Sequence, residues 1–257
     1  MATLVVENLA VEFGGVAALA GVSFAVRPGT ITSLIGPNGA GKTTAFNAIT
    51  GYLRPRRGRV TFEGEPLTGR RPCDVARRGV VRTFQKTSVF GGLTVRENVL
   101  TGLHLRGRVG VAAALLARAR VRAEEERLAG EADRVIDFVG LGARRDELAS
   151  GLSYGDQRLL ELAVALAAGP RLLLLDEPAS GMTASEKATV AGLIGRIREQ
   201  GVTVFLVEHD MRLVMGISDR VLVLNYGRLI ADGDPAAVQR DPEVVRAYLG
   251  SGAHAHA

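Results

Sequence analysis

Along the first third of the chain, hydrophobic and polar positions follow a pattern that predicts strands. β-Branched residues are frequent in TLVVENL, VSFAVRPGTITSLIG and GRVTFEGEPL, and glycines and the triplet Arg27-Pro28-Gly29 interrupt these stretches. Short strands separated by such turns are typical of antiparallel hairpins. We therefore expect an N-terminal antiparallel β subdomain, with its hairpins on the edge of a larger sheet.

The pattern becomes helical after the stretch GVVRTFQ. Thr94 can cap the segment VRENVLTGL, and Ala, Leu, Arg and Glu recur at helical spacing in VGVAAALLARARVRAEEERLAGEADRVIDFVGL. These segments predict an inserted helical subdomain over approximately residues 87–158.

In the remainder of the chain, helical segments alternate with short apolar runs. Leu, Val and Ile dominate the runs in RLLLLDEP, VTVFLVEHD and RVLVLNYG. Such runs, joined through helices, indicate parallel strands that are buried on both faces. The expected fold class is therefore α/β, with a mostly parallel sheet. We expect a single domain over residues 1–250 and a flexible tail over residues 251–257.

The composition is that of an ordinary globular protein, since 47% of the 257 residues are hydrophobic and 23% are charged. The longest apolar runs are far shorter than the roughly 20 residues that cross a bilayer, and we expect no secretion signal. Because Cys73 is the single cysteine, an internal disulfide and a multi-cysteine metal site are excluded. The net charge of +5 is spread among acidic residues, so we expect no nucleic-acid partner.

A phosphate-binding motif follows the predicted strand ITSLI. The segment GPNGAGKT, residues 36–43, has the form G-x-x-x-x-G-K-[ST] and leads into the predicted helix TAFNAIT. Its glycines let backbone N–H groups curl around a phosphate chain, and the helix N-terminus adds a positive end. Lys42 is expected to reach the β- and γ-phosphates, and Thr43 to offer its hydroxyl to Mg²⁺. The nucleotide-binding candidates are Gly36, Pro37, Asn38, Gly39, Ala40, Gly41, Lys42, Thr43 and Thr44.

Polar residues also end three of the predicted strands. Asp176 and Glu177 follow LLLL, His209 follows VTVFLVE, and Gln85 ends VVRTFQ. The carboxyl ends of parallel strands form the ligand crevice of open α/β sheets, so these side chains would face bound phosphates. Asp176 is suited to hold Mg²⁺ and Glu177 to polarise an attacking water. His209 and Gln85 can hydrogen-bond the γ-phosphate, the water or the metal, although each of the four is also compatible with a structural role.

The order of these motifs, together with LSYGDQ at residues 152–157, resembles that of the ATP-binding-cassette (ABC) ATPases over nearly the whole chain. More narrowly, VRTFQ, LTVRENV, LSYGDQRLLELA, VEHDMRLVMGISD and VVRAYLG look like the ATP-binding subunits of branched-chain amino-acid importers. The resemblance implies a P-loop NTPase core with ATP and Mg²⁺ as cofactors, powering transport through separate membrane permease subunits. A substrate-binding protein would be an indirect partner, and the chain would lie on the cytoplasmic face of the cell membrane.

The resemblance also assigns roles to the strand-end residues. Glu177 would be the general base, Asp176 the carboxylate that holds Mg²⁺, and His209 a bridge to the γ-phosphate. Gln85 would contact the metal or the water. Phe13, in VEFGGVAAL, matches the aromatic residue that stacks on adenine, although an edge-strand core position also explains it.

A dimer is implied as well, formed with a second copy or with a sister subunit. In such dimers each nucleotide lies between the P-loop of one subunit and the LS-x-G turn of the other, so Ser153 and Gly155 would face the γ-phosphate held by the partner. Asp156 departs from the glutamine that most family members carry, and an anion there should repel a triphosphate. Ser153 and Asp156 also fit the helix-capping pattern [ST]-x-x-[DE], so we expect the turn both to start a helix and to contact a phosphate.

Two other kinds of ABC ATPase are alternatives to the importer subunit. Soluble members that act on nucleic acid or ribosomes carry long coiled-coil arms or tandem cassettes, and the sequence contains neither. Lipid-export ATPases are of similar size, but the sequence segments LSYG and VEHDM disfavour them.

Overall fold

The computed structural model describes residues 3–83, 89–104 and 118–251. The chain divides into two compact units, the first made of residues 1–82, 171–180 and 187–257 and the second of residues 83–170 and 181–186. The second unit contains the range expected for the helical insert and extends beyond it. Of the expected tail, only Ser251 is described, and it ends a helix.

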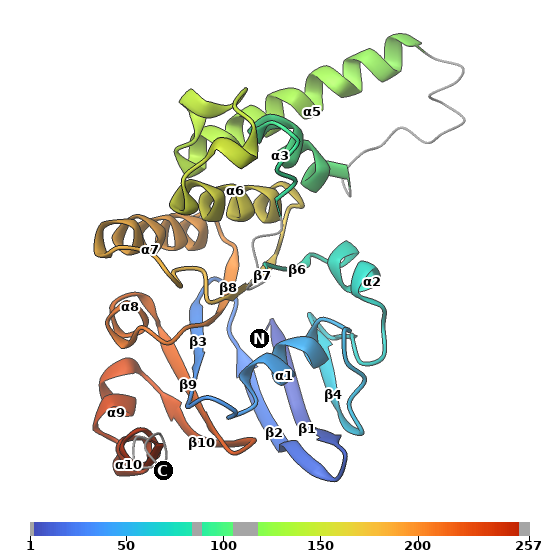
Figure 1. The fold of residues 1–257 in the computed structure, drawn as a ribbon. Coiled ribbons are helices and arrows are strands. Elements are labelled where there is room, and N and C mark those ends of the chain that lie inside the picture. The colour runs from blue at the N-terminus through green and yellow to red at the C-terminus, as the bar shows by residue number, and fades with distance from the viewer. Residues whose placement is uncertain (1–2, 84–88, 105–117, 252–257) are drawn as a thin grey trace. The chain divides into compact units, whose positions relative to one another are not determined.

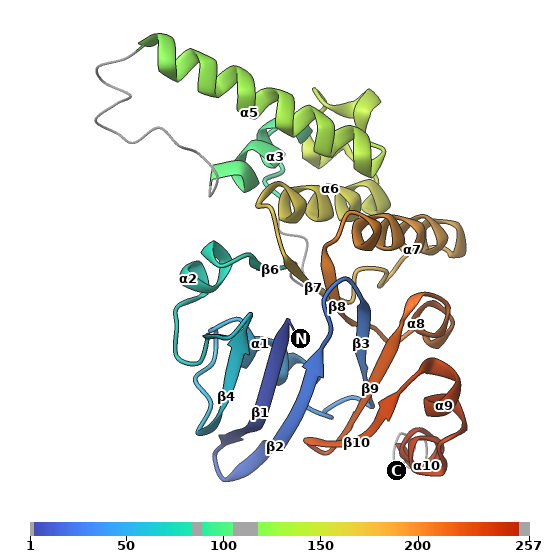
Figure 2. The ribbon, with the colours of Figure 1, turned by 180° about the vertical axis from the view of Figure 1, so that it is seen from behind.

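The first unit contains two sheets, which Figures 1 and 2 show from opposite sides. One is antiparallel, with the strand order β2-β1-β4-β5, and the other has the order β10-β9-β3-β8-β7-β6 and is parallel apart from β10. The antiparallel strands are β1 (Leu4–Phe13), β2 (Val16–Val26), β4 (Arg57–Phe62) and β5 (Glu65–Pro66). The second sheet contains β3 (Ile31–Ile35), β6 (Val80–Arg82), β7 (Leu172–Asp176), β8 (Thr203–Val207), β9 (Arg220–Asn225) and β10 (Arg228–Gly233).

The α/β class with a mostly parallel sheet is confirmed, but the placement of the N-terminal hairpins is wrong. These strands form a sheet of their own instead of the edge of a larger one. The predicted run VSFAVRPGTITSLIG divides at Pro28 and at Gly29, which has a φ of 66°. Its second half, β3, lies in the middle of the parallel sheet between β8 and β9.

The parallel sheet is buried on both faces, as β9 illustrates. Leu222 and Leu224 enter a large core shared with the antiparallel sheet and α1 (Lys42–Ile49), whereas Val221 and Val223 enter a smaller core. Because successive side chains of a strand point to opposite faces, this alternation assigns one core to each face. The smaller core is covered by α8 (Met211–Ile217), α9 (Pro235–Arg240) and α10 (Pro242–Ser251) (Figure 1).

Three aromatic rings pack against one another within the large core. The ring of Phe205, on β8, lies 5.0 Å from that of Phe46, on α1, and 5.5 Å from that of Phe24, on β2, between ring centroids. One strand of the parallel sheet therefore packs against both α1 and the antiparallel sheet. The first unit also contains α2 (Pro72–Arg77) and most of α7 (Ala184–Glu199).

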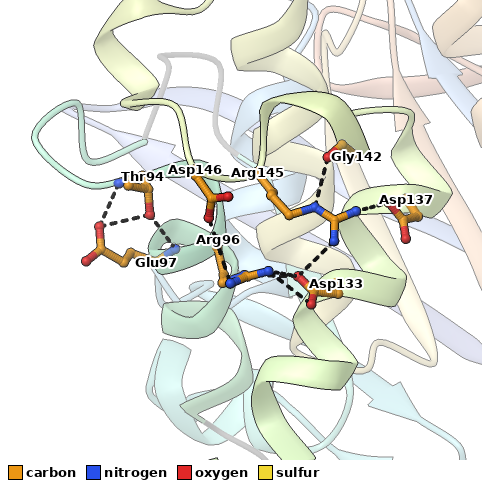
Figure 3. Close-up of polar contacts among 8 residues, drawn as sticks. All are labelled: Thr94, Arg96, Glu97, Asp133, Asp137, Gly142, Arg145 and Asp146. Carbon is orange, nitrogen blue, oxygen red and sulfur yellow. Dashed lines mark hydrogen bonds and ion pairs between the residues drawn. The ribbon is translucent and has the colours of Figure 1, made fainter. Parts of the chain in front are cut away.

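The second unit is helical among its described residues. It contains α3 (Val95–Leu103), α5 (Arg118–Val139), α6 (Tyr154–Ala167) and the short 3₁₀ turns η2 (Gly142–Arg144) and η3 (Ala149–Gly151). The predicted cap of α3 is confirmed, because the Thr94 hydroxyl accepts from the Glu97 N–H at 3.2 Å while the Glu97 carboxylate accepts from the Thr94 N–H at 2.7 Å (Figure 3). None of the described helices combines the length and the apolar character that a membrane span needs.

Ion pairs join α3 and α5 within the second unit (Figure 3). The guanidinium of Arg96 donates to both carboxylate oxygens of Asp133, at 3.0 and 3.1 Å, and that of Arg145 donates to Asp137 at 2.9 Å. The backbone N–H of Arg96 also donates to the carbonyl of Arg145 at 2.9 Å. These contacts fix the segment after η2 against the start of α3 and the last turns of α5.

Candidate functional site

The register of the parallel sheet brings the ends of three strands to one edge. Val207, at the end of β8, pairs with Leu34 of β3 on one side and with Asp176 of β7 on the other. The residues that follow these strands are the P-loop (residues 36–43), Glu177 and His209. The candidates predicted on these three strands therefore share the sheet edge at which α/β proteins bind ligands.

Lys42 is buried at the start of α1, with 7% of its surface exposed. Its ammonium donates to the carbonyl oxygens of Gly36 and Pro37, at 2.6 and 2.9 Å. Burial lowers the pKa of Lys42 below its usual value, and the negative charges of Glu177 and Asp176 oppose this shift. A buried cation held by carbonyl oxygens is well placed to exchange them for the oxygens of a phosphate, which carry a full charge.

Two glycines of the P-loop are required by close backbone contacts. A Cβ on Gly36 would lie 2.1 Å from the Leu224 carbonyl oxygen, and one on Gly41 would lie 2.5 Å from that of Ala18. Gly41 also has a φ of 104°, which disfavours other residues. The loop is therefore pressed against neighbouring strands. Ala40 is buried within it, Asn38 and Gly39 are exposed, and Thr43 and Thr44 lie in the first turn of α1.

Tyr248, on α10, supports the P-loop from the other side of the sheet. It packs at the edge of the smaller core, which includes Ile35. Burial raises the pKa of the Tyr248 hydroxyl to about 12, and a hydrogen bond from the backbone N–H of Gly36 acts in the opposite direction. The C-terminal helix thus contacts the first residue of the phosphate loop, which sequence reasoning missed.

Asp176 forms a buried ion pair with Arg82, the last residue of β6. The Arg82 Nη2 and Asp176 Oδ2 atoms are 2.6 Å apart, and the side chains are 6% and 4% exposed. Nη1 of Arg82 also donates to the side-chain oxygen of Asn47, on α1, at 2.7 Å. Arg82 therefore connects the P-loop helix to the predicted metal carboxylate, a role that sequence reasoning missed because the pair is separated by 94 positions.

Glu177 and His209 contact each other directly. The Glu177 Oε1 and His209 Nε2 atoms are 2.6 Å apart. Glu177 has a φ of 51°, an unfavourable value for a residue with a side chain, and its N–H donates to the Val207 carbonyl at 2.9 Å. Backbone strain of this kind costs about 1–3 kcal/mol and is frequent at functional sites. The strained backbone and the imidazole together fix the carboxylate at the sheet edge.

Glu208 is a positioning residue that sequence reasoning did not single out. It is 3% exposed, and its two carboxylate oxygens accept from the backbone N–H groups of Ala179, at 2.8 Å, and His209, at 3.0 Å. One buried side chain thus ties the loop after Glu177 to the backbone of His209. In the sequence, Glu208 is marked only by its place after the apolar run VFLV, and this pattern does not reveal that its side chain is buried.

The remaining predicted residues of the nucleotide site are placed only in part. Phe13 ends β1 and is 52% exposed, so it is a surface aromatic and not a core residue. Gln85 lies outside the described residues, and its predicted role stays a prediction.

The turn at residues 152–157, called here the signature turn, lies in the second unit. Ser153 caps α6 by accepting from the Asp156 N–H at 3.1 Å, so the predicted helix start is confirmed. The Asp156 carboxylate accepts from the Ser153 hydroxyl at 2.6 Å and from Arg144 at 2.8 Å. Gly155 is buried, and a Cβ there would lie 2.4 Å from a carboxylate oxygen of Glu186. Ser153 itself is exposed.

A glycine loop around a buried lysine, adjacent to strand-end carboxylates on a parallel sheet, defines the class of P-loop nucleoside triphosphatases. Comparisons with known proteins give the family. A family model described as ABC transporter matches residues 19–180, and one described as branched-chain amino acid ATP-binding cassette transporter matches residues 228–254. The chain belongs to the ATP-binding subunits of the ABC transporter family, for which ATPase activity is expected.

Relatives and solved structures match over almost their whole length. The chain is 42% identical to the high-affinity branched-chain amino acid transport ATP-binding protein LivG of Escherichia coli, over 96% of this chain and 97% of that protein. It is 41% identical, with the same coverage, to the corresponding protein BraF of Pseudomonas aeruginosa. An ATP-binding cassette of an ABC transporter, solved in its ADP conformation, matches with a TM-score of 0.86 and 33% identity, over 97% of this chain and 99% of that chain.

The first prediction concerns the buried ion pair. We expect Arg82→Met to destabilise the protein by about 3–5 kcal/mol, because it leaves the Asp176 carboxylate buried without its cation. Urea unfolding measures the loss. The double variant Arg82→Met/Asp176→Asn removes the stranded charge and should recover part of it, whereas equal losses in the single and double variants would contradict this explanation.

The second prediction concerns Glu208. Glu208→Gln replaces one acceptor oxygen with an amide that faces a backbone N–H, so the loop that carries Glu177 should shift. We expect kcat for ATP hydrolysis to fall by about 10-fold or more with little change in ATP affinity, because misplacing a reacting group affects the chemical step. Steady-state kinetics and nucleotide titration measure the two quantities. Glu199→Gln, at an exposed position on α7, is the control, and an equal effect there would exclude a positioning role.

Proposed function

We propose that this chain is the ATP-hydrolysing subunit of an importer of branched-chain or related amino acids, working with separate membrane permease subunits. The observation that carries the proposal is the 42% identity to LivG across 96% of the chain. The match of residues 228–254 to a branched-chain amino acid transporter model supports the same substrate class. The substrate itself would be selected by the permease and by a substrate-binding protein, which contacts this chain only indirectly.

The nucleotide would be held by the first unit. In this proposal backbone N–H groups within residues 38–44 surround the phosphates, and the Lys42 ammonium exchanges its carbonyl partners for phosphate oxygens. Phe13 offers an exposed ring at the end of β1 on which adenine can stack. Tyr248 and the backbone of Leu224 keep the first glycine of the loop in place.

The residues present fit a magnesium ion. Thr43 provides an exposed hydroxyl and Asp176 a carboxylate at the same sheet edge as the P-loop, and such hard oxygen ligands are those that Mg²⁺ prefers. The predicted third ligand, Gln85, would contribute an amide oxygen. When bound, the ion would neutralise part of the negative charge of the phosphates. Arg82 fixes the orientation of the Asp176 carboxylate toward this task.

Glu177 would act as the general base. It accepts a proton from the attacking water while His209, 2.6 Å away, holds the carboxylate and is available to the γ-phosphate. Glu208 holds the backbone N–H of His209 and, in the loop after Glu177, that of Ala179, so the water would meet a preorganised carboxylate.

The signature turn would serve a nucleotide held by another subunit. Ser153 and Gly155 lie in the second unit, whereas the P-loop lies in the first, and the family resemblance assigns them to the γ-phosphate bound by a partner. That partner is a second copy or a sister ATPase subunit. Residues 1–250 would form one ABC ATPase domain, with the second unit as its helical subdomain. The assembly would lie on the cytoplasmic face of the membrane, with no nucleic acid involved.

The third prediction tests the catalytic assignment. We expect Glu177→Gln to retain ATP binding and to accumulate an ATP-bound dimer, while hydrolysis falls by about 10²–10⁴-fold because the base is lost. Light scattering with and without ATP measures the dimer, and phosphate release measures turnover. Adding Lys42→Ala to this variant should abolish the dimer. Unchanged turnover in Glu177→Gln would remove Glu177 from the base role.

The fourth prediction tests the importer. We expect the tagged chain, purified from its native membrane, to bring down membrane permease subunits, and we expect its deletion to reduce uptake of labelled leucine. Mass spectrometry identifies the companions. Recovery with nucleic acid or ribosomes, or unchanged leucine uptake together with a permease for another substrate, would contradict the proposed transport role.

A further inference from the structure

Asp156 forms hydrogen bonds with Ser153 and with Arg144, and these contacts explain how the signature turn accommodates an acid. Its Oδ2 atom accepts from the hydroxyl of Ser153 at 2.6 Å and from Nη1 of Arg144 at 2.8 Å. The Ser153 hydroxyl accepts in return from the Asp156 N–H at 3.1 Å. The Ser153 hydroxyl therefore donates its proton to a carboxylate oxygen that also accepts a hydrogen bond from Arg144.

The position of Arg144 is fixed by its backbone and by its neighbour. Its N–H donates to the Leu141 carbonyl at 2.9 Å, and its carbonyl accepts from the Glu147 N–H at 3.0 Å. The next residue, Arg145, is held by Asp137 and by the carbonyl of Gly142, each at 2.9 Å (Figure 3). Hydrogen bonds of its own backbone and of its neighbour thus hold the turn from which the Arg144 side chain extends.

The charge of Asp156 matters because of what the turn would face. A carboxylate next to Ser153 repels a triphosphate, and it also competes with the phosphate for the Ser153 proton. Arg144 opposes both effects, since it neutralises the carboxylate and supplies one of its hydrogen bonds. The pair contributes little to stability, because the side chains are 44% and 22% exposed.

We propose that Arg144 is a positioning residue of the signature turn, which neutralises Asp156 and so weakens its competition for the Ser153 hydroxyl with the γ-phosphate of the nucleotide bound by the partner subunit. This inference rests on the proposed function, because it needs a nucleotide held by a second subunit. It adds a residue outside the LSYGDQ motif to the ATP site and explains how this chain tolerates an acid where glutamine is common in the family.

The test uses full-length Glu177→Gln as the parent and measures the ATP concentration that gives half of the maximal dimer. Adding Arg144→Ala should raise this concentration by about five-fold, the upper range for an exposed ion pair. The increase should shrink at high salt, because screening weakens repulsion between Asp156 and the triphosphate. Adding Asp156→Asn to the Arg144→Ala variant should return this concentration to the parent value. Arg144→Lys, which keeps the positive charge, should give a concentration close to that of the parent.

Arg122→Ala is the matched control, since Arg122 forms an exposed ion pair with Glu126 on α5. It should leave both the dimer and the melting temperature unchanged. Parent-like dimer formation in Arg144→Ala, or a loss that Asp156→Asn does not relieve, would overturn the role of Arg144. A parent that stays monomeric with ATP would instead overturn the proposed dimer, and the role of Arg144 with it, before any Arg144 variant is compared.

Discussion

A buried ammonium group at the first turn of α1 is the constraint on which the nucleotide site depends. The Lys42 ammonium donates to two backbone carbonyls, and burial lowers its pKa, so the site is set to receive negatively charged oxygens. The P-loop can hold the lysine in this way only because Gly36 and Gly41 allow it to lie against neighbouring backbone. The central strand β3 and the core around Phe205 in turn fix where the loop begins.

The other charges at this sheet edge are arranged around that cation. Arg82 holds Asp176, and His209 holds Glu177. Glu208 accepts from backbone N–H groups in the loop after Glu177 and at His209, and so links these two segments. Each acid is thus oriented before a substrate arrives, which is how a site preorganises its electrostatics. An acid is also paired in the second unit, where the Arg144 guanidinium donates to the Asp156 carboxylate of the signature turn.

The sequence predicted what local patterns specify. The Thr94 cap involves a residue three positions away, and the apolar runs of the parallel sheet and the phosphate loop are continuous segments, so all were recognisable. The pairs Arg82–Asp176 and Arg144–Asp156 depend on residues that the fold brings together, and no local pattern marks them. The sheet assignment of the N-terminal hairpins failed for the same reason, because strand propensity does not say which strands pair. Gln85 remains a prediction.

The central claim is that one chain holds the P-loop half of an ATP site while the signature turn completes the site of its partner. Two differently tagged copies, one carrying Lys42→Ala and the other Ser153→Arg, test it when dimers bearing both tags are isolated. Each variant alone should be inactive, whereas the mixed dimer contains one intact composite site and should hydrolyse ATP at about half of the wild-type rate if the two sites act independently. A mixed dimer as inactive as either parent would contradict the account.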